Sequence, residues 1–335
     1  MSRNKLHGVL TAEDLKLYHS LPYEERPKLI FDGDQTIAAD HINPYLFDAP
    51  DILIERRPQP LCDVPRMIYG NKPVDGGNLI IEANELEDFL RREPRAKKFI
   101  RRLIGGEEFI NNLPRYCLWL VDATPNEIRS MPGVYKRVEA VRQMRLVSRN
   151  ADTRKLADRP HLFRDTNVFD HYIAVPRVSS ERRKYIPIGF LTAEVIVGDS
   201  MSVVPNATLY HFGILTSSVH MAWMRRVCGR LKSDYRYSGT VVYNNFIWCE
   251  PTAEQRQSIE HSAQKILDAR AKYPDSSLAD LYDEVTMPRG LRAAHQENDN
   301  AVLDAYNFDR DWEEAEIVSR LMEMYSDLAG TSNDF

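Results

Sequence analysis

Residues 205–238 read PNATLYHFGILTSSVHMAWMRRVCGRLKSDYRYS, and this stretch decides how the middle of the chain folds. Within it, residues 216–228 place apolar side chains four positions apart, which is the spacing of one side of an α-helix. Upstream, residues 171–215 are rich in β-branched and aromatic residues broken by proline and glycine, a composition that favours several short strands. The apolar side of the predicted helix consists of Val219, Trp223 and Val227.

The segment that follows this helix carries alternating polar residues. Gly229 stands where the helix would stop. Residues 230–236 then read RLKSDYR. Because alternate side chains of an extended loop point the same way, we expect Lys232, Asp234 and Arg236 to share one face.

The rest of the chain predicts an α+β protein, with a mixed α/β domain followed by a small C-terminal helical domain. Beyond residue 250 the apolar spacing is mostly helical, so we expect the domain boundary there. Residues 84–104 also read as helical. Capping boxes predict helix starts at Thr11, Thr124 and Thr252. Strands are expected at residues 28–31, 51–55, 79–81, 116–121 and 240–248.

Charge is segregated along the 335 residues, although the net charge is only -5. Residues 91–240 carry 27 basic and 14 acidic side chains, a net charge of +13, whereas the segments before and after are acidic. A domain with such an excess of cations attracts polyanions, of which nucleic acid is the abundant intracellular example. We expect the basic residues to form one surface. They cluster at residues 91–102, 182–184 and 225–236.

The sequence lacks the motifs that mark several classes of protein. No apolar run approaches the roughly 18 residues of a membrane span, and no signal peptide is evident, so a cytoplasmic protein without a membrane partner is expected. The G-x-S-x-G, Walker and G-x-G-x-x-G motifs are missing. The four cysteines and nine histidines form no close ligand pattern, so we assign neither a metal site nor catalytic residues.

Longer runs carry a resemblance to a known family. They look like the target-recognition domain and C-terminal helical domain of MmeI-like (type IIG/IIL) adenine-N6 DNA methyltransferase/restriction enzymes. The similarity covers nearly the whole chain from about residue 40. Besides residues 205–238, the runs are INPYLFDAPD at 42–51, YGNKPVDGGNLII at 69–81, RYCLWLVDATP at 115–125, VSSERRKYIPIGF at 178–190, VVYNNFIWCEPT at 241–252 and SLADLYDEVTMPRGLRAAHQENDNAV at 277–302.

The resemblance implies a sequence-specific double-stranded DNA recognition module from a restriction-modification system. Residues 41–250 would form the target-recognition domain, residues 251–335 the helical domain, and residues 1–40 a remnant of the methyltransferase edge or a linker. The glycine-rich S-adenosylmethionine loop and the N-P-P-Y motif of the family have no counterpart here. We therefore expect no cofactor and no catalysis from this chain alone. S-adenosylmethionine is expected on the missing methyltransferase domain, and a separate methyltransferase/endonuclease polypeptide could be a partner.

Base readout is expected from Lys232, Asp234 and Arg236. Lysine donates to guanine O6 and N7, and aspartate accepts from cytosine N4, so Lys232 and Asp234 together could read one G·C pair. The resemblance implies the same, since Lys with Asp at these positions implies guanine and Glu with Arg implies cytosine. The competing interpretation is a surface ion pair of little energetic consequence. Phosphate or groove contacts are expected from Arg182, Arg183, Lys184, Arg225, Arg226 and Arg230.

Two other functions stay open at this point. The chain could be a small, divergent S-adenosylmethionine-dependent DNA methyltransferase, or an inactive gene remnant. Calorimetry with S-adenosylmethionine separates the first from a pure recognition module, because only a methyltransferase would bind the cofactor.

Overall fold

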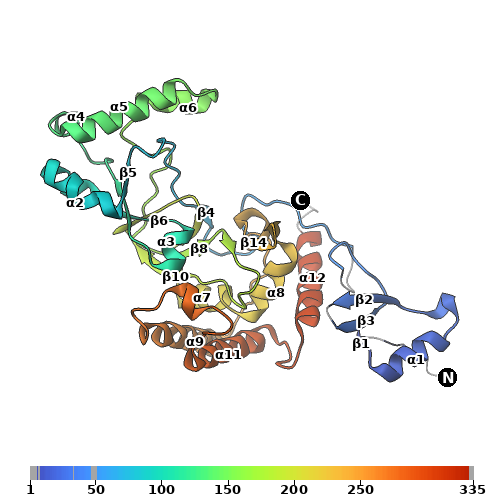
Figure 1. Cartoon of the computed structure of the whole chain (residues 1–335). Coiled ribbons are helices and arrows are strands. Elements are labelled where there is room, and N and C mark those ends of the chain that lie inside the picture. Colours follow the sequence, from blue (N-terminus) through green and yellow to red (C-terminus); the bar gives the residue numbers. More distant parts are fainter. Residues whose placement is uncertain (1–5, 7, 33, 47–50, 332–335) are drawn as a thin grey trace.

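The computed structural model describes residues 6, 8–32, 34–46 and 51–331. It is a mixed arrangement of helices and small sheets (Figure 1), as the sequence predicts. The strands are β1 Gly8–Val9, β2 Lys28–Asp32, β3 Gln35–Ala39, β4 Ile68–Tyr69, β5 Ile80–Glu82, β6 Ile100–Ile104, β7 Arg115–Leu118, β8 His171–Pro176, β9 Val178–Ser179, β10 Gly189–Thr192, β11 Val195–Val197, β12 Met201–Pro205, β13 Gly229–Leu231 and β14 Asp234–Arg236.

Helices and strands are interspersed up to residue 243, and after it the described elements are all helices. The α-helices are α1 Ala12–Ser20, α2 Ala83–Arg92, α3 Gly106–Asn111, α4 Pro125–Arg129, α5 Pro132–Leu146, α6 Ala151–Lys155, α7 Leu209–Leu215, α8 Ser218–Val227, α9 Ala253–Ala271, α10 Leu278–Leu281, α11 Arg289–Tyr306 and α12 Glu314–Thr331. The short 3-10 helices are η1 Tyr23–Glu25, η2 Pro94–Phe99 and η3 Leu156–Asp158, and η4 Gly239–Tyr243 is a single π-turn. The capping boxes at Thr11, Thr124 and Thr252 are all present, which confirms those three helix starts.

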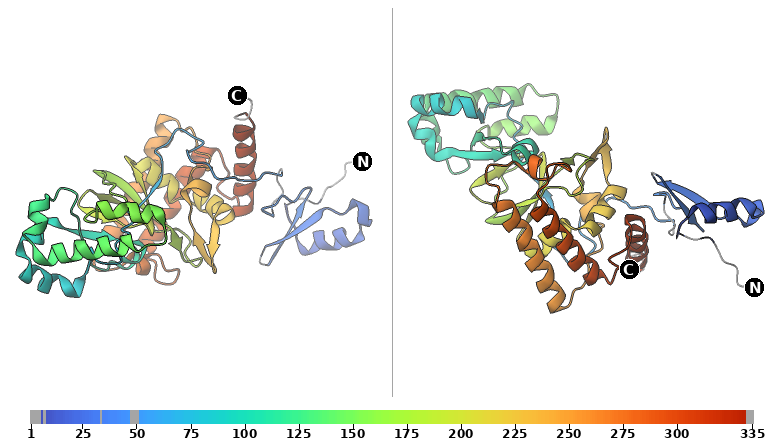
Figure 2. Two further views of the ribbon diagram at one scale, coloured as in Figure 1. Left: turned by 90° about the horizontal axis from the view of Figure 1, so that it is seen from above. Right: turned by 60° about the horizontal axis from the view of Figure 1, so that its bottom comes forward.

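Four small sheets organise the strands. The first, β1-β3-β2, is antiparallel and stands with α1 apart from the rest of the molecule in Figures 1 and 2. The second, β10-β8-β12-β4, is also antiparallel. In the third, β11-β6-β7-β5, only β11 and β6 run parallel. The fourth, β13-β14-β9, is the sheet that carries the candidate site.

The largest hydrophobic core is continuous across residue 250. It joins the strands and helices of the middle of the chain, including Ile173 and Trp223, to the C-terminal helices through Ile259 and Leu321. A second core fills the space between α2, α5 and the third sheet. Gly213 shows how closely the helices on either side of residue 250 approach, because a Cβ at that position would lie 2.6 Å from Cγ2 of Ile259. The C-terminal helices therefore share the core of the segment that precedes them.

Three expectations about secondary structure are wrong. Residues 100–104 are strand β6 rather than the end of a helix, because Pro94 ends the helical run and the segment pairs with β7 and β11. Residues 51–55 pair with no neighbouring strand, and residues 240–248 form the η4 turn and a loop. In both, side chains satisfy the backbone instead of a neighbouring strand, since Asn245 donates to the carbonyl of Glu55 at 2.9 Å.

Within residues 6, 8–32, 34–46 and 51–331, no helix is both long enough and apolar enough to span a bilayer.

Candidate nucleic-acid interface

The segment at residues 230–236 is a β-hairpin rather than a single extended loop. Strands β13 and β14 pair antiparallel, and Leu231 stands directly opposite Asp234. Lys232 and Ser233 form the two-residue turn between them. Lys232 adopts a left-handed backbone with φ of 57°, a conformation that costs an L-residue about 1–2 kcal/mol. The turn places Lys232 at the tip of the hairpin, while Asp234 and Arg236 share one face of β14.

The two faces of this sheet have different environments. On one face Tyr235 is buried opposite Ser179 of β9, and the guanidinium of Arg230 stacks 4.1 Å from the centre of the Tyr235 ring. Arg230 also donates to the carbonyl of Ser233 at 3.0 Å, which ties the turn to its own strand. The other face carries Asp234 and Arg236 together with apolar neighbours. It points into a cleft.

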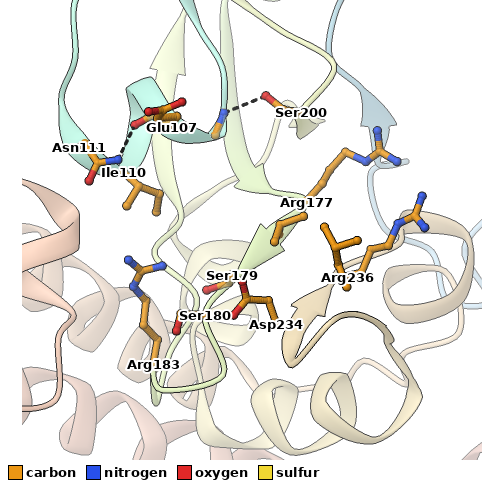
Figure 3. A pocket seen from close by; sticks show the side chains of 13 residues that line it. Glu107, Ile110, Asn111, Arg177, Ser179, Ser180, Arg183, Ser200, Asp234 and Arg236 are labelled. Atoms are coloured by element: carbon orange, nitrogen blue, oxygen red, sulfur yellow. Dashed lines mark hydrogen bonds between the residues drawn. The ribbon is translucent and has the colours of Figure 1, made fainter.

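The cleft has a volume of about 660 Å³ and lies between α3, β9 and the hairpin (Figure 3). Three arginines from different segments line it, and Figure 3 shows Arg177 and Arg236 extending on one side with Arg183 on the other. The remaining lining residues are Gly106, Glu107, Ile110, Asn111, Val178, Ser179, Ser180, Ser200, Leu231 and Asp234.

Arg183 is the half-buried member of the predicted group 182–184, whose other two residues are exposed. Burial lowers the pKa of the Arg183 guanidinium, and the carboxylates of Asp234 and Asp283 act against that shift. The side chains of Arg183 and Asp234 therefore belong to one electrostatic group within the cleft. Arg182 and Lys184 flank this group on the surface.

Arg177 lines the cleft but was not among the residues selected from the sequence. Its guanidinium lies 4.5 Å from the centre of the Tyr69 ring and donates to the carbonyl of Asp199 at 2.8 Å. Its own carbonyl accepts from the Tyr237 amide at 2.9 Å, which fixes it next to the end of β14. Since Arg177 is an isolated basic residue, charge clustering could not select it. Pairing between distant strands brings it here.

Arg225 and Arg226, which were expected to contact phosphate, instead contact a carboxylate of the protein itself. Arg225 lies 2.5 Å from the carboxylate of Glu314 in α12, and Arg226 lies 4.0 Å from the same group. Their side chains are only 19% and 28% exposed, and Arg225 also donates to the carbonyl of Lys184. The two residues join α8 to the C-terminal helix and hold the basic segment at 182–184.

The cleft draws on only part of the basic residues that the sequence groups together. Residues 91–102 lie on α2, η2 and β6, around the second core, whereas the cleft takes its arginines from positions 177, 183 and 236. Part of the first cluster is paired locally, since Arg91 contacts Asp88 at 2.8 Å and Lys98 forms a close ion pair with Glu127. Linear charge density therefore overestimates the area of the basic face.

Buried polar groups connect α8 to α11 and to the segments that follow Arg183 and Arg236 in the chain. Asp299 of α11 accepts from the Tyr185 hydroxyl at 2.6 Å and from the Ser218 amide at 2.7 Å. Burial raises the pKa of Asp299, against the effect of these donors. His220 of α8 lies 2.9 Å from the Tyr237 hydroxyl, and burial lowers the pKa of His220 to about 3. Tyr235 and Tyr237 are themselves buried, so they pack rather than offer rings to a ligand.

Comparisons with known proteins match nearly all of the chain. The model of the MmeI target recognition domain matches residues 48–250, and that of the MmeI C-terminal domain matches residues 251–332. DNA methyltransferase A of Bacillus subtilis (strain 168) is 38% identical over 300 residues, covering 88% of this chain and 34% of that protein.

A solved structure agrees with these matches. It is that of the Type IIL restriction-modification enzyme MmeI in complex with DNA, with a TM-score of 0.86 and 42% sequence identity, covering 90% of this chain and 41% of that chain. The present chain thus spans well under half of the length of either relative. These matches confirm the resemblance seen in the sequence, and the chain belongs to the MmeI family, of which it carries the target recognition domain followed by the C-terminal domain.

Proposed function

We propose that this chain is the double-stranded DNA recognition module of an adenine-specific DNA methyltransferase in a restriction-modification system. The observation that carries the proposal is the hairpin β13–β14, whose face with Asp234 and Arg236 lines a cleft that also contains Arg177 and Arg183. The complex of the related MmeI with DNA supports DNA as the ligand.

The dimensions and chemistry of the hairpin suit the major groove. That groove admits a two-stranded β-ribbon, and each base pair presents a distinct pattern of donors and acceptors there. Asp234 supplies acceptors for cytosine N4, and Arg236 supplies paired donors for guanine O6 and N7. Lys232, exposed at the tip, extends the same edge by one more donor. We infer that Lys232 and Asp234 read the guanine and the cytosine of one pair.

Phosphate contacts position such a module without carrying sequence information. Arg182 and Lys184 are exposed beside the cleft and fit this role. Arg183 and Arg177 lie deeper and are proposed to contact the groove. Arg230 is exposed, but it stacks on Tyr235, so we propose that it mainly stabilises the hairpin.

We further propose that methyl transfer takes place on a domain that is not contained in these 335 residues. The relatives are two to three times as long as the part matched here, and one of them is named a DNA methyltransferase. S-adenosylmethionine would bind to that domain, whether it lies on the same or on a separate polypeptide. Calorimetric titration of this chain with S-adenosylmethionine should give no heat of binding; saturable binding would favour the divergent methyltransferase instead.

Selection from randomised duplexes followed by titration at fixed salt tests the readout. Lys232→Ala and Asp234→Ala should each reduce discrimination at the same base pair by about 1–3 kcal/mol. The exposed Lys272, which follows the last residue of α9, provides the matched control, and Lys272→Ala should leave the preference unchanged. Equal weakening of binding on all duplexes by the two hairpin variants would contradict base readout.

The double variant Lys232→Glu, Asp234→Arg gives a second test that requires a gain of function. The resemblance implies that this pair selects cytosine in place of guanine. Because Glu and Lys meet the same left-handed backbone at position 232, the exchange should preserve the turn. The selected sequence should then change at one position only.

A further inference from the structure

We propose that Leu231 recognises the C5-methyl group of a thymine in the base pair next to the one that Asp234 reads. This inference rests on the proposed function and names a contact at the same face of the hairpin. Leu231 is 51% exposed and lines the cleft together with Asp234 and Arg236. It is the last residue of β13, immediately before the turn.

Exposure alone does not distinguish Leu231, because single exposed leucines are ordinary. Leu146 at the end of α5, for example, is 47% exposed. What distinguishes Leu231 from Leu146 is its position in the sheet. Leu231 stands directly opposite Asp234 in the antiparallel pair, on the face that points into the cleft, so the two side chains leave the sheet together.

The spacing of this pair matches the spacing of bases. The Cβ atoms of directly opposite residues in an antiparallel pair lie about 4.5–5.5 Å apart. Successive bases along a DNA strand rise about 3.4 Å. When the carboxylate of Asp234 reaches a cytosine N4 group, the side chain of Leu231 is therefore within one base step of it.

The chemistry of the groove then selects the ligand group. The C5-methyl of thymine is the apolar group that base pairs present at the major-groove edge. Leu231 has no donor or acceptor in its side chain, and Val178, 40% exposed, widens the same apolar face from β9 opposite Arg236. A charged hairpin face with a leucine at its leading edge thus complements a G·C pair beside a pair that contains thymine.

The test removes the methyl group from the DNA and the side chain from the protein. The preferred duplex from the randomised selection is resynthesised with deoxyuridine in place of each thymine in turn, and the full chain is titrated at constant salt. The unmodified chain should lose about fourfold in affinity at one thymine position next to the G·C pair. Leu231→Ala should bind the thymine and deoxyuridine duplexes equally, whereas Leu146→Ala should retain the difference.

Each outcome bears on a separate claim. A selection that yields no preferred sequence contradicts the proposed function itself. A preferred sequence that lacks thymine beside the G·C pair, or that tolerates deoxyuridine everywhere, contradicts only the role of Leu231. If 5-methylcytosine at the G·C pair gains affinity through Leu231 while deoxyuridine has no effect, the thymine assignment is also wrong. The deoxyuridine titrations use the unmodified chain, so they test the thymine contact even if Leu231→Ala does not fold.

Discussion

The C-terminal end of α8 and the adjoining hairpin contain arginines only ten residues apart, yet the two regions use them differently. Arg225 and Arg226 of α8 face Glu314 of α12 and are largely buried. Arg236 of the hairpin is exposed and lines the cleft. An arginine whose carboxylate partner comes from the protein stabilises the fold, whereas we propose that one lining the open cleft keeps its donors for a ligand.

The C-terminal helices create this difference. They supply Glu314 to α8, and they supply Asp299 to the Ser218 amide at the start of the same helix. In contrast, the cleft side of the hairpin faces α3 across open space. The following changes test the contrast between a stabilising region and a binding region, beginning with the largest expected effect.

Removal of the Asp299 carboxylate should have the largest effect on stability. Asp299→Ala leaves the buried Tyr185 hydroxyl and the partly buried Ser218 amide without their acceptor, and we expect the free energy of unfolding to fall by about 4 kcal/mol. Urea denaturation measures this value. Asp275, an exposed aspartate, serves as the control, and Asp275→Ala should change it by less than about 0.5 kcal/mol. A loss of similar size in both variants would remove the distinction between the regions.

Acid pH should weaken the junction between α8 and the hairpin. Burial lowers the pKa of His220 to about 3, against about 6.5 in the unfolded chain, so between these values the unfolded state binds a proton that the folded state does not. Stability is therefore fully present above pH 6.5 and is lost as the pH falls, by about 3 kcal/mol at pH 4.5 from this group alone.

Urea denaturation of two histidine variants at several pH values measures how the free energy of unfolding depends on pH. His220→Gln should reduce the slope of unfolding free energy against pH by about one proton. His261→Gln, at an exposed position, should leave the slope as it is. An unchanged slope in His220→Gln would assign the acid sensitivity to other groups.

Two arginine substitutions compare the regions directly. Arg225→Ala should lower the free energy of unfolding by about 1–2 kcal/mol, since it leaves the half-buried Glu314 with only the more distant Arg226, but it should leave the preferred DNA sequence unchanged. Arg236→Ala should do the opposite, with little loss of stability and a relaxation of one sequence position by about 1–3 kcal/mol. Denaturation and duplex titration of both variants measure the two effects. The reverse pattern would show that the assignment of roles is wrong.

The smallest effect concerns the turn of the hairpin. Lys232→Gly removes the left-handed strain but adds chain entropy to the unfolded state, so we expect a gain of about 0.5 kcal/mol in stability. The same variant should lose discrimination at the G·C pair because the lysine donor is gone. Lys232→Asn tolerates the same backbone and provides the matched comparison. Stability that falls in Lys232→Gly would mean that the lysine side chain itself supports the turn.

Local patterns predicted much of the secondary structure. The apolar spacing of residues 216–228 corresponds to α8, and the run of β-branched residues before it corresponds to β8 through β12. The expected strand at residues 240–248 is wrong because Asn245 satisfies the opposite segment with its side chain, a long-range contact that no local pattern contains. The shared face of Asp234 and Arg236 was predictable from alternation, although the turn at Lys232 was not.

The linear sequence was sufficient for the family and for the mixed fold class, because these depend on composition, on short-range periodicity and on long matching runs. The tertiary structure alone decided which basic residues face the cleft. It buried Arg225 against Glu314, 89 residues away, and brought the isolated Arg177 beside Arg236. The physical reason is that the availability of a charged side chain depends on its partners, and packing brings those partners from distant parts of the chain.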